Sequence, residues 1–133
     1  MADRQSHRFV LIVEDDDNIA TALEYVISRE GLDQDRVANG ADALGRIRAL
    51  RPDLVLLDVM LPEVSGYEIC RTVRLDKTLG DVKILMMTAR GSVTERRKGM
   101  ALGADGFISK PFELKELRAE MRRLLGAGAQ AGL

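Results

Sequence analysis

The sequence places four consecutive acidic residues, Glu14 to Asp17, directly after an aliphatic segment that begins at Phe9. Two carboxylates about 5 Å apart repel each other by roughly 3 kcal/mol at an effective dielectric constant near 20. Such a run therefore needs a bound cation, the positive end of a helix dipole, or open water around it. Which of these applies to each carboxylate decides what chemistry the run can support.

Three more polar residues follow short apolar segments: Asp58, Thr88 and Lys110. In an open parallel sheet, ligands bind beyond the carboxyl ends of the strands, so side chains that follow different strands meet at one edge. A lysine beside carboxylates and a divalent ion can offset the charge on a phosphoryl group during its transfer. Thr88 can donate a hydroxyl hydrogen bond to the same group. The pattern therefore predicts a phosphoryl-group site at this edge.

The acidic run divides into two pairs with different expected roles. Asp16 and Asp17 stand where the first helix should begin, a position at which carboxylates cap a helix and oppose its dipole. Glu14 and Asp15 end the first apolar segment and are expected to face Asp58. Three carboxylates at one edge suit Mg²⁺, which prefers hard oxygen ligands and keeps several waters, with Mn²⁺ as the alternative ion.

Apolar segments alternate with helix-period patterns along the chain, which predicts the α/β fold class. The apolar segments are short and nearly continuous, as in strands that are buried on both faces of a sheet. Expected strands are 9–13, 33–37, 54–57, 84–87 and 106–109, of which the second is more polar and suits a sheet edge. Expected helices cover 19–27, 43–50, 69–73, 92–102 and 114–124. Five alternations predict an open, doubly wound parallel sheet with helices on both faces.

The helix expected at 92–102 has the weakest apolar face. Val93 and Met100 share a face, but Arg96 and Arg97 lie between them, and Gly99 costs about 1 kcal/mol relative to alanine. We expect this helix to be the least firmly packed. Conformational switches are often drawn from such elements, although an exposed helix without that role would show the same pattern.

Length and composition indicate one globular domain. The chain has 133 residues, of which 46% are hydrophobic, and no apolar segment is long enough to span a bilayer. Its single cysteine, Cys70, cannot form an internal disulfide, so the expected location is the reducing cytoplasm, with no membrane contact. We expect the domain to cover residues 1–125, and residues 126–133 to form a flexible Gly/Ala tail or the start of a linker.

The net charge of −1 argues against general nucleic-acid binding but conceals an asymmetry. Residues 1–76 hold 15 acids and 9 bases, whereas residues 77–133 hold 6 acids and 11 bases. The asymmetry fits solvated helix faces of opposite sign. It also fits an acidic ion site on one side and a basic partner surface on another.

Four motifs, in this order and spacing, resemble the receiver domain of two-component response regulators. They are "VEDD", "PDLVLLDVMLPEVSG", "ILMMTA" and "GADGFISKPF", and the similarity runs from about Arg8 to Leu125. The resemblance implies a flavodoxin-like sheet of five parallel strands in the order 2-1-3-4-5. It also implies a signalling domain, not an enzyme that turns over external substrates.

For the reaction, the resemblance implies that Asp58 accepts a phosphoryl group and becomes an aspartyl phosphate. The donor would be a phosphohistidine on a sensor histidine kinase or a histidine phosphotransfer protein. Thr88 and Lys110 would contact the new phosphoryl oxygens. The Lys110–Pro111 peptide bond would be cis. The domain would catalyse only its own phosphorylation and a slow autodephosphorylation.

For the metal, the resemblance implies that Asp15 binds Mg²⁺ directly and Glu14 binds it through water. Asp58 and the backbone carbonyl of Met60 would complete the protein's ligands. Met60 and Arg90 also match positions that tune access of the hydrolytic water, and would therefore set the lifetime of the phosphoryl group.

The resemblance further implies a switch. Phe107 matches an aromatic residue that moves inward as Thr88 approaches the phosphoryl group, although a simple core phenylalanine would look the same in sequence. The surface that changes would be formed by residues 92–102, the fifth strand and the last helix. That surface is basic through Arg96, Arg97, Lys98, Lys115, Arg118 and Arg122.

The switching surface would bind a downstream protein target or an output domain, with no direct nucleic-acid contact by this domain. In the winged-helix transcription factors of the family it dimerises through ion pairs. Here Gly106 replaces an expected acid and Glu120 an expected base. Of the two expected states, monomer or phosphorylation-linked dimer, these departures disfavour the dimer and favour a free-standing regulator or a domain with another output.

Two rival functions use the same residues. A Mg²⁺-dependent phosphohydrolase of the haloacid-dehalogenase type also forms an aspartyl phosphate, but it places a second aspartate two residues after the nucleophile. Met60 occupies that position, so the general acid is missing. A receiver-like scaffold that is not phosphorylated would usually lack the acceptor or a ligand, and this sequence contains all of them.

Overall fold

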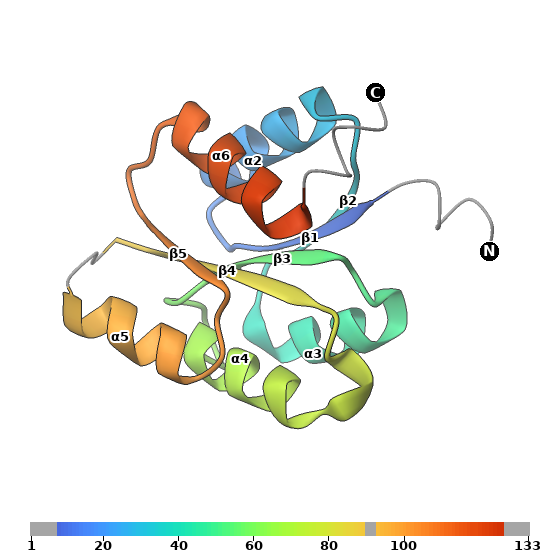
Figure 1. The fold of residues 1–133 in the computed structure, drawn as a ribbon, viewed down its shortest axis with the longest axis vertical. Coiled ribbons are helices and arrows are strands. Elements are labelled where there is room, and N and C mark those ends of the chain that lie inside the picture. The colour runs from blue at the N-terminus through green and yellow to red at the C-terminus, as the bar shows by residue number, and fades with distance from the viewer. Residues whose placement is uncertain (1–7, 90–92, 127–133) are drawn as a thin grey trace.

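The computed structural model describes residues 8–89 and 93–126. A five-stranded sheet runs through the middle of the molecule (Figure 1). Its strands are β1 (Phe9–Val13), β2 (Asp33–Val37), β3 (Leu54–Asp58), β4 (Lys83–Thr88) and β5 (Gly106–Ser109). All neighbours pair in parallel in the order β2-β1-β3-β4-β5, which confirms the predicted fold class and strand order.

Helices cover both faces of this sheet. They are α2 (Asp17–Arg29), α3 (Gly40–Leu50), α4 (Gly66–Leu75), α5 (Val93–Ala101) and α6 (Leu114–Leu125), and a short 3₁₀ helix, η1 (Lys77–Leu79), follows α4. Figure 1 shows α2 and α6 on one side and α3, α4 and α5 on the other. None of the described helices combines the length and the apolarity that crossing a bilayer would require.

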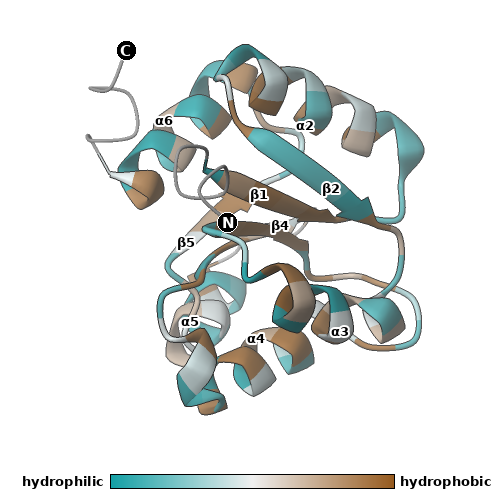
Figure 2. Ribbon diagram, turned by 90° about the vertical axis from the view of Figure 1, so that its right-hand side faces the viewer, coloured by the Kyte–Doolittle hydropathy of each residue, from teal (hydrophilic) through white to brown (hydrophobic). Residues whose placement is uncertain are grey.

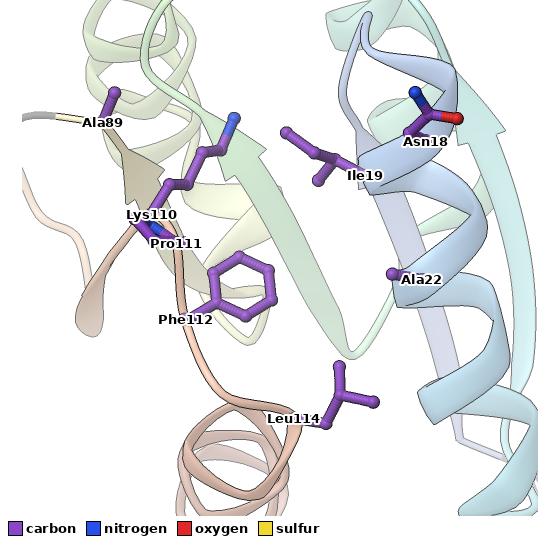
Figure 3. Close-up of a pocket in the computed structure, with 8 residues that line it drawn as sticks. All are labelled: Asn18, Ile19, Ala22, Ala89, Lys110, Pro111, Phe112 and Leu114. Carbon is purple, nitrogen blue, oxygen red and sulfur yellow. The ribbon is translucent and has the colours of Figure 1, made fainter.

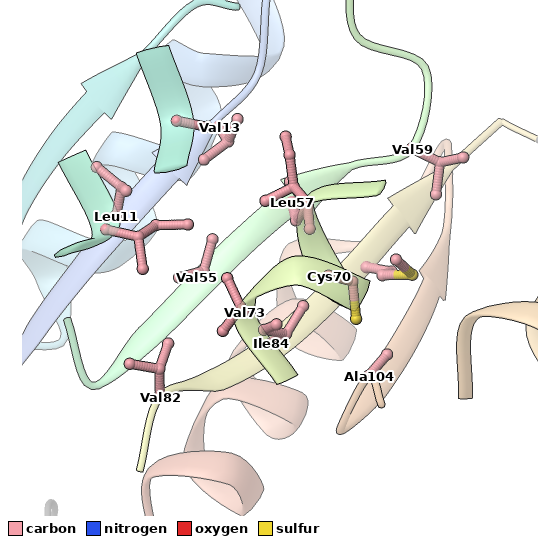
Figure 4. Packing of buried hydrophobic residues seen from close by; sticks show 14 of the residues in the cluster. Leu11, Val13, Val55, Leu57, Val59, Cys70, Val73, Val82, Ile84 and Ala104 are labelled. Carbon is pink, nitrogen blue, oxygen red and sulfur yellow. The ribbon is translucent and has the colours of Figure 1, made fainter. Parts of the chain in front are cut away.

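Two apolar clusters hold the layers together, one on each face. Alternate residues of a strand point to opposite faces, so Val10 and Ile12 pack with α2 and α6, whereas Leu11 and Val13 pack with α3 and α4. Figure 4 shows the second of these clusters. The central strands are buried almost throughout, which explains their continuous apolar sequence.

Strand β2 is the polar edge strand that the sequence predicts. In Figure 2, β2 is hydrophilic along its length, whereas β1 and β4 are hydrophobic. Of its residues only Val37 is buried. A polar edge leaves room for long charged side chains to lie across the end of the sheet.

Local side-chain caps mark the starts of α2, α3 and α4. The Asp16 carboxylate accepts hydrogen bonds from the amides of Asn18 (2.8 Å) and Ile19 (3.1 Å), so it caps α2 as predicted. Asn39 caps α3 and Ser65 caps α4 in the same way. These caps fix where each helix begins relative to the strand before it.

Element boundaries differ slightly from the sequence prediction. Strand β3 extends to Asp58 and β4 to Thr88, because the sheet pairing continues through Asp58 with Met87 and through Thr88 with Ser109. The η1 turn is not predicted; Asp76 nucleates it by accepting hydrogen bonds from the Thr78 amide and hydroxyl. Helix α5 buries only Gly99 among its described residues, in agreement with its weak apolar pattern.

Candidate functional site

Three carboxylates from two adjacent strands meet at the carboxyl edge of the sheet. Glu14 and Asp15 follow β1, and Asp58 ends β3, which pairs with β1. One oxygen from each of the three carboxylates lies within 4.8 Å of the others. Glu14 is 1% exposed and Asp58 is 3% exposed, whereas Asp15 lies open to solvent. An ion could therefore reach the buried pair from the side of Asp15.

Lys110 supplies the positive charge at this cluster. Its Nζ lies 2.7 Å from Glu14 Oε1 and 3.4 Å from Asp58 Oδ1. The side chain is placed by the end of β5, where the Lys110 amide donates to the Thr88 carbonyl (2.7 Å). The following Lys110–Pro111 bond is cis, as the resemblance implies. One ammonium therefore bridges two buried carboxylates and offsets part of their repulsion.

Backbone amides also donate to the two buried carboxylates. Asp58 Oδ1 accepts from the Met60 amide (3.1 Å), and Glu14 Oε2 accepts from the Asp16 amide (3.1 Å). Burial raises the pKa of Glu14 above its ordinary value, and the nearby Asp58 charge adds to this; the hydrogen bonds from Lys110 and Asp16 act against it. The surroundings of Glu14 therefore disfavour its ionised form.

Thr88 lies on β4, which pairs with the strand of Asp58, and Phe107 lies on β5, one strand further out. Thr88 is 1% exposed at the end of β4, and Phe107 is 5% exposed on β5, paired with Met86 and packed in the core. Phe107 thus lies inward in this structure. The switching roles assigned to Thr88 and Phe107 remain predictions. Arg90, assigned to tuning of the phosphoryl lifetime, lies outside the described residues.

The donor set at this edge fits a hard divalent cation. All three ligand side chains offer carboxylate oxygens, and the exposed position of Asp15 leaves space for the water molecules that Mg²⁺ retains. The Met60 side chain is 67% exposed beside the cluster, whereas its backbone carbonyl remains a predicted ligand.

An apolar hollow of about 500 Å³ lies next to Lys110 (Figure 3). It lies between α2 and the segment that leads from β5 into α6, and its lining is Asn18, Ile19, Ala22, Ala89, Lys110, Pro111, Phe112 and Leu114. The sequence does not reveal this hollow, because Ile19 and Leu114 follow the core pattern of their helices. The one feature that could have indicated it is the apolar pair Pro111 and Phe112 directly after Lys110.

Arg36 is a second residue whose contact with the site the sequence does not reveal. It lies on the edge strand β2, yet its guanidinium reaches the acidic run and donates to the Glu14 carbonyl. The two residues are far apart in sequence, and only the register of β1 with β2 brings them together.

Comparison with known proteins gives a consistent answer. The family model of the response regulator receiver domain matches residues 10–122. The DNA-binding response regulator MtrA of Mycolicibacterium smegmatis is 42% identical over 116 residues, which cover 87% of this chain and 50% of MtrA. The chain spans about half the length of the curated relatives it matches.

Solved structures agree in fold. A putative response regulator from Chloroflexus aurantiacus is 37% identical with a TM-score of 0.85, covering 90% of this chain and 98% of that chain. The receiver domain of a Pseudomonas aeruginosa sensor histidine kinase, solved with magnesium coordinated in its active-site cleft, is 28% identical with a TM-score of 0.82, over 90% of this chain and 98% of that one.

The acidic edge of the five-stranded sheet, the adjacent lysine and the family match over most of the chain lead to one assignment. The chain belongs to the response regulator receiver family of two-component signalling.

Proposed function

We propose that this chain is the phosphoacceptor of a two-component phosphorelay and that Asp58 receives the phosphoryl group. The observation that carries the proposal is the setting of Asp58: a buried carboxylate with the Lys110 ammonium 3.4 Å away and two more carboxylates within 4.8 Å. A lone buried carboxylate beside a lysine would be a salt bridge. Three carboxylates with one lysine leave room for a metal and a phosphoryl group.

The transfer follows from these positions. An Asp58 oxygen attacks the phosphorus of a phosphohistidine, the P–N bond breaks, and the imidazole leaves with the electron pair and takes up a proton. Lys110, already near Asp58, then binds the phosphoryl oxygens, and Thr88 donates its hydroxyl from the next strand. Bound Mg²⁺, or Mn²⁺ in its place, would supply positive charge to the transferring oxygens, held by Glu14, Asp15, Asp58 and the Met60 carbonyl.

The hollow beside Lys110 supports a protein donor. Its apolar lining lies next to the lysine, so a helix that carries the phosphohistidine can seat an apolar side chain there while the imidazole approaches Asp58. The donor would be a sensor histidine kinase or a histidine phosphotransfer protein. The relative with magnesium in its cleft is the receiver of such a kinase, and it supports the metal half of the proposal.

The output follows from the switch surface. Capture of the phosphoryl group by Thr88 and Lys110 favours a conformation in which α5, β5 and α6 present a new surface to a downstream protein. In relatives named as DNA-binding regulators, the segment that matches this chain is about half of the protein, which supports an attached output domain as the downstream element. We assign the receiver to residues 1–125, place it in the cytoplasm, and assign control of the phosphoryl lifetime to Met60 and Arg90.

Intact mass after incubation with Mg²⁺ and a small acyl phosphate tests the proposal. One added phosphoryl group is expected on the native chain, and none on Asp58→Ala or in the presence of EDTA. Asp81→Asn is the matched control. It removes an exposed aspartate outside the carboxylate cluster and should accept the phosphoryl group normally. An adduct that persists on Asp58→Ala would contradict the assignment.

The rivals predict different products. A folded chain that binds Mg²⁺ but neither gains mass nor releases phosphate from the donor would be a scaffold. Phosphate release over many rapid turnovers would indicate a hydrolase, for which Met60 lacks the proton-donating group that the second aspartate supplies.

A further inference from the structure

Arg36 crosses the end of the sheet and fastens the acidic run. On β2 it pairs in register with Ile12 of β1. Its Nε and Nη2 donate to the Glu14 carbonyl oxygen at 3.0 and 2.9 Å, and its Nη1 donates to Asp17 Oδ1 at 2.8 Å. The side chain is only 23% exposed, so the guanidinium is held against the loop and is not freely solvated.

The two anchor points of Arg36 lie on either side of Asp15. The rest of the run is also held: Glu14 by Lys110 and the Asp16 amide, and Asp16 by the first amides of α2. Among the described residues, the Asp15 carboxylate is the one in the run to which no hydrogen bond or ion pair is found. The run is thus a braced loop with one unpartnered carboxylate at its centre.

We infer that Arg36 is a positioning residue for the magnesium site, and that it holds the Glu14–Asp17 loop in the shape in which Asp15 faces Asp58. The inference rests on the proposed function. Arg36 touches neither the metal ligand oxygens nor the phosphoacceptor, and it acts through the Glu14 backbone and the Asp17 side chain.

A guanidinium could act on a metal site in two opposite ways. As a positive charge it would repel the cation, so its loss would tighten metal binding. As a brace it would lower the cost of ordering the loop, so its loss would weaken metal binding. The Asp17 carboxylate, at 2.8 Å, opposes the charge of the guanidinium, whereas the two bonds from Arg36 to the Glu14 carbonyl have no substitute. The bracing effect should therefore dominate.

Direct metal binding, without any phosphoryl donor, tests this inference. Free Mn²⁺ can be followed by electron paramagnetic resonance and displaced with Mg²⁺, which yields both dissociation constants for each variant. Residues that support metal ligands typically contribute about 10- to 100-fold to affinity, and Arg36 acts through backbone, so Arg36→Met should weaken Mg²⁺ binding about tenfold. Arg36→Lys keeps the charge but cannot reproduce the fork, and it should weaken binding nearly as much.

A matched control is available on the neighbouring helix α3. Arg46 of α3 forms an ion pair with Asp35, the residue before Arg36, and makes no contact with the acidic run. Arg46→Met should leave the Mg²⁺ dissociation constant unchanged. Circular dichroism and thermal unfolding of all three variants show whether each is folded, so a loss of metal affinity in a folded Arg36 variant is specific.

The outcomes separate the inference from the proposed function. If Arg36→Met binds Mg²⁺ as tightly as the native chain or more tightly, or if Arg36→Lys retains native affinity, the bracing role is wrong while the receiver function stands. If the native chain binds neither ion but still takes up a phosphoryl group on Asp58, the inference about Arg36 is wrong. Asp58 then remains the phosphoacceptor, but without a metal. Native binding with about tenfold weaker binding in both Arg36 variants supports it.

Discussion

At the scale of single residues, the site is a balance between buried negative charge and one ammonium. Glu14 and Asp58 are both nearly inaccessible, and Lys110 lies close to each. Removing charged groups from water costs free energy that a single partner repays only in part. The empty site is therefore electrostatically unfavourable, and this supports the cation binding that we propose for it.

The Glu14→Gln variant measures this cost through pH. Because burial raises the pKa of Glu14, the folded chain holds the Glu14 proton more tightly than the unfolded chain does. The stability from this group is complete below the ordinary value of 4.5 and is lost as pH rises through the raised pKa. Glutamine cannot ionise, so the variant does not lose this stability. The unfolding free energy of the variant minus that of the native chain should therefore increase as pH rises from 4.5.

Urea unfolding in EDTA, at several pH values from about 4.5 upward, gives the difference in unfolding free energy. Glu68→Gln, at an exposed position on α4, is the matched control and should show no such trend. Mg²⁺ favours the ionised form and should reduce the trend. A difference between Glu14→Gln and the native chain that stays constant with pH would show that burial does not disfavour this charge.

At the scale of elements, α4 begins against the end of β3, the strand that carries Asp58. Gly66 is the first residue of α4, and its amide donates to the Val59 carbonyl (3.0 Å). A Cβ atom at this position would lie 2.4 Å from the Asp58 backbone oxygen, far inside van der Waals contact. The absence of a side chain is therefore what allows the helix to start so close to Asp58.

The Gly66→Ala variant should destabilise the chain by about 1–3 kcal/mol, as overpacking does, and slow phosphorylation by displacing Asp58. Gly45→Ala is the matched control: Gly45 lies in α3 with nothing within 4 Å of its Cβ position, so alanine should add up to about 1 kcal/mol of stability. Urea unfolding and phosphorylation rates measure both effects. If the Gly66→Ala chain has native stability and a native phosphorylation rate, the backbone at Asp58 can shift to admit the methyl group without destabilising the fold.

The sequence predicts the sheet and the cluster well because both follow from local patterns. Continuous apolar segments mark the central strands, and parallel pairing sends Glu14, Asp15, Asp58 and Lys110 to one edge without further information. Helix starts follow from caps such as Asp16, which needs only its own neighbours in sequence.

Contacts that depend on long-range geometry are not predictable in this way. Arg36 reaches Glu14 only because β2 pairs with β1 in one particular register, and the hollow beside Lys110 depends on the spacing between α2 and the start of α6. The η1 turn is local, because Asp76 accepts two hydrogen bonds from Thr78, but this pair belongs to no apolar repeat. Apolar periodicity contains no information about any of these three.

At the scale of the whole molecule, the face formed by α5, β5 and α6 is the one that we propose passes on the signal. On this face, Glu120 and Arg123 form an ion pair within α6 at 2.8 Å, and Arg123 also donates to the Asp105 carbonyl at 3.1 Å. The Asp105 carboxylate binds Arg74 at 2.6 Å. The charges around β5 are thus neutralised inside one chain.

Gly106 is central to this arrangement. A Cβ there would lie 3.0 Å from Arg123 Nη2 and 3.1 Å from Glu120 Oε1, so the internal ion pair occupies the space of the acidic side chain that the family pattern leads one to expect. A dimer through this face needs acids and bases that remain available to a second copy. In this chain Gly106 provides no acid, and Glu120 provides no base.

We therefore predict that the chain stays monomeric after phosphorylation of Asp58, as measured by light scattering over a range of protein concentrations. The double variant Gly106→Asp/Glu120→Arg restores the acid and the base, and it should dimerise when phosphorylated, because the internal pair with Arg123 is lost and both groups can pair across copies. Dimerisation of the phosphorylated native chain would contradict the prediction. A double variant that is phosphorylated yet monomeric would show that these two charges are not what prevents the dimer.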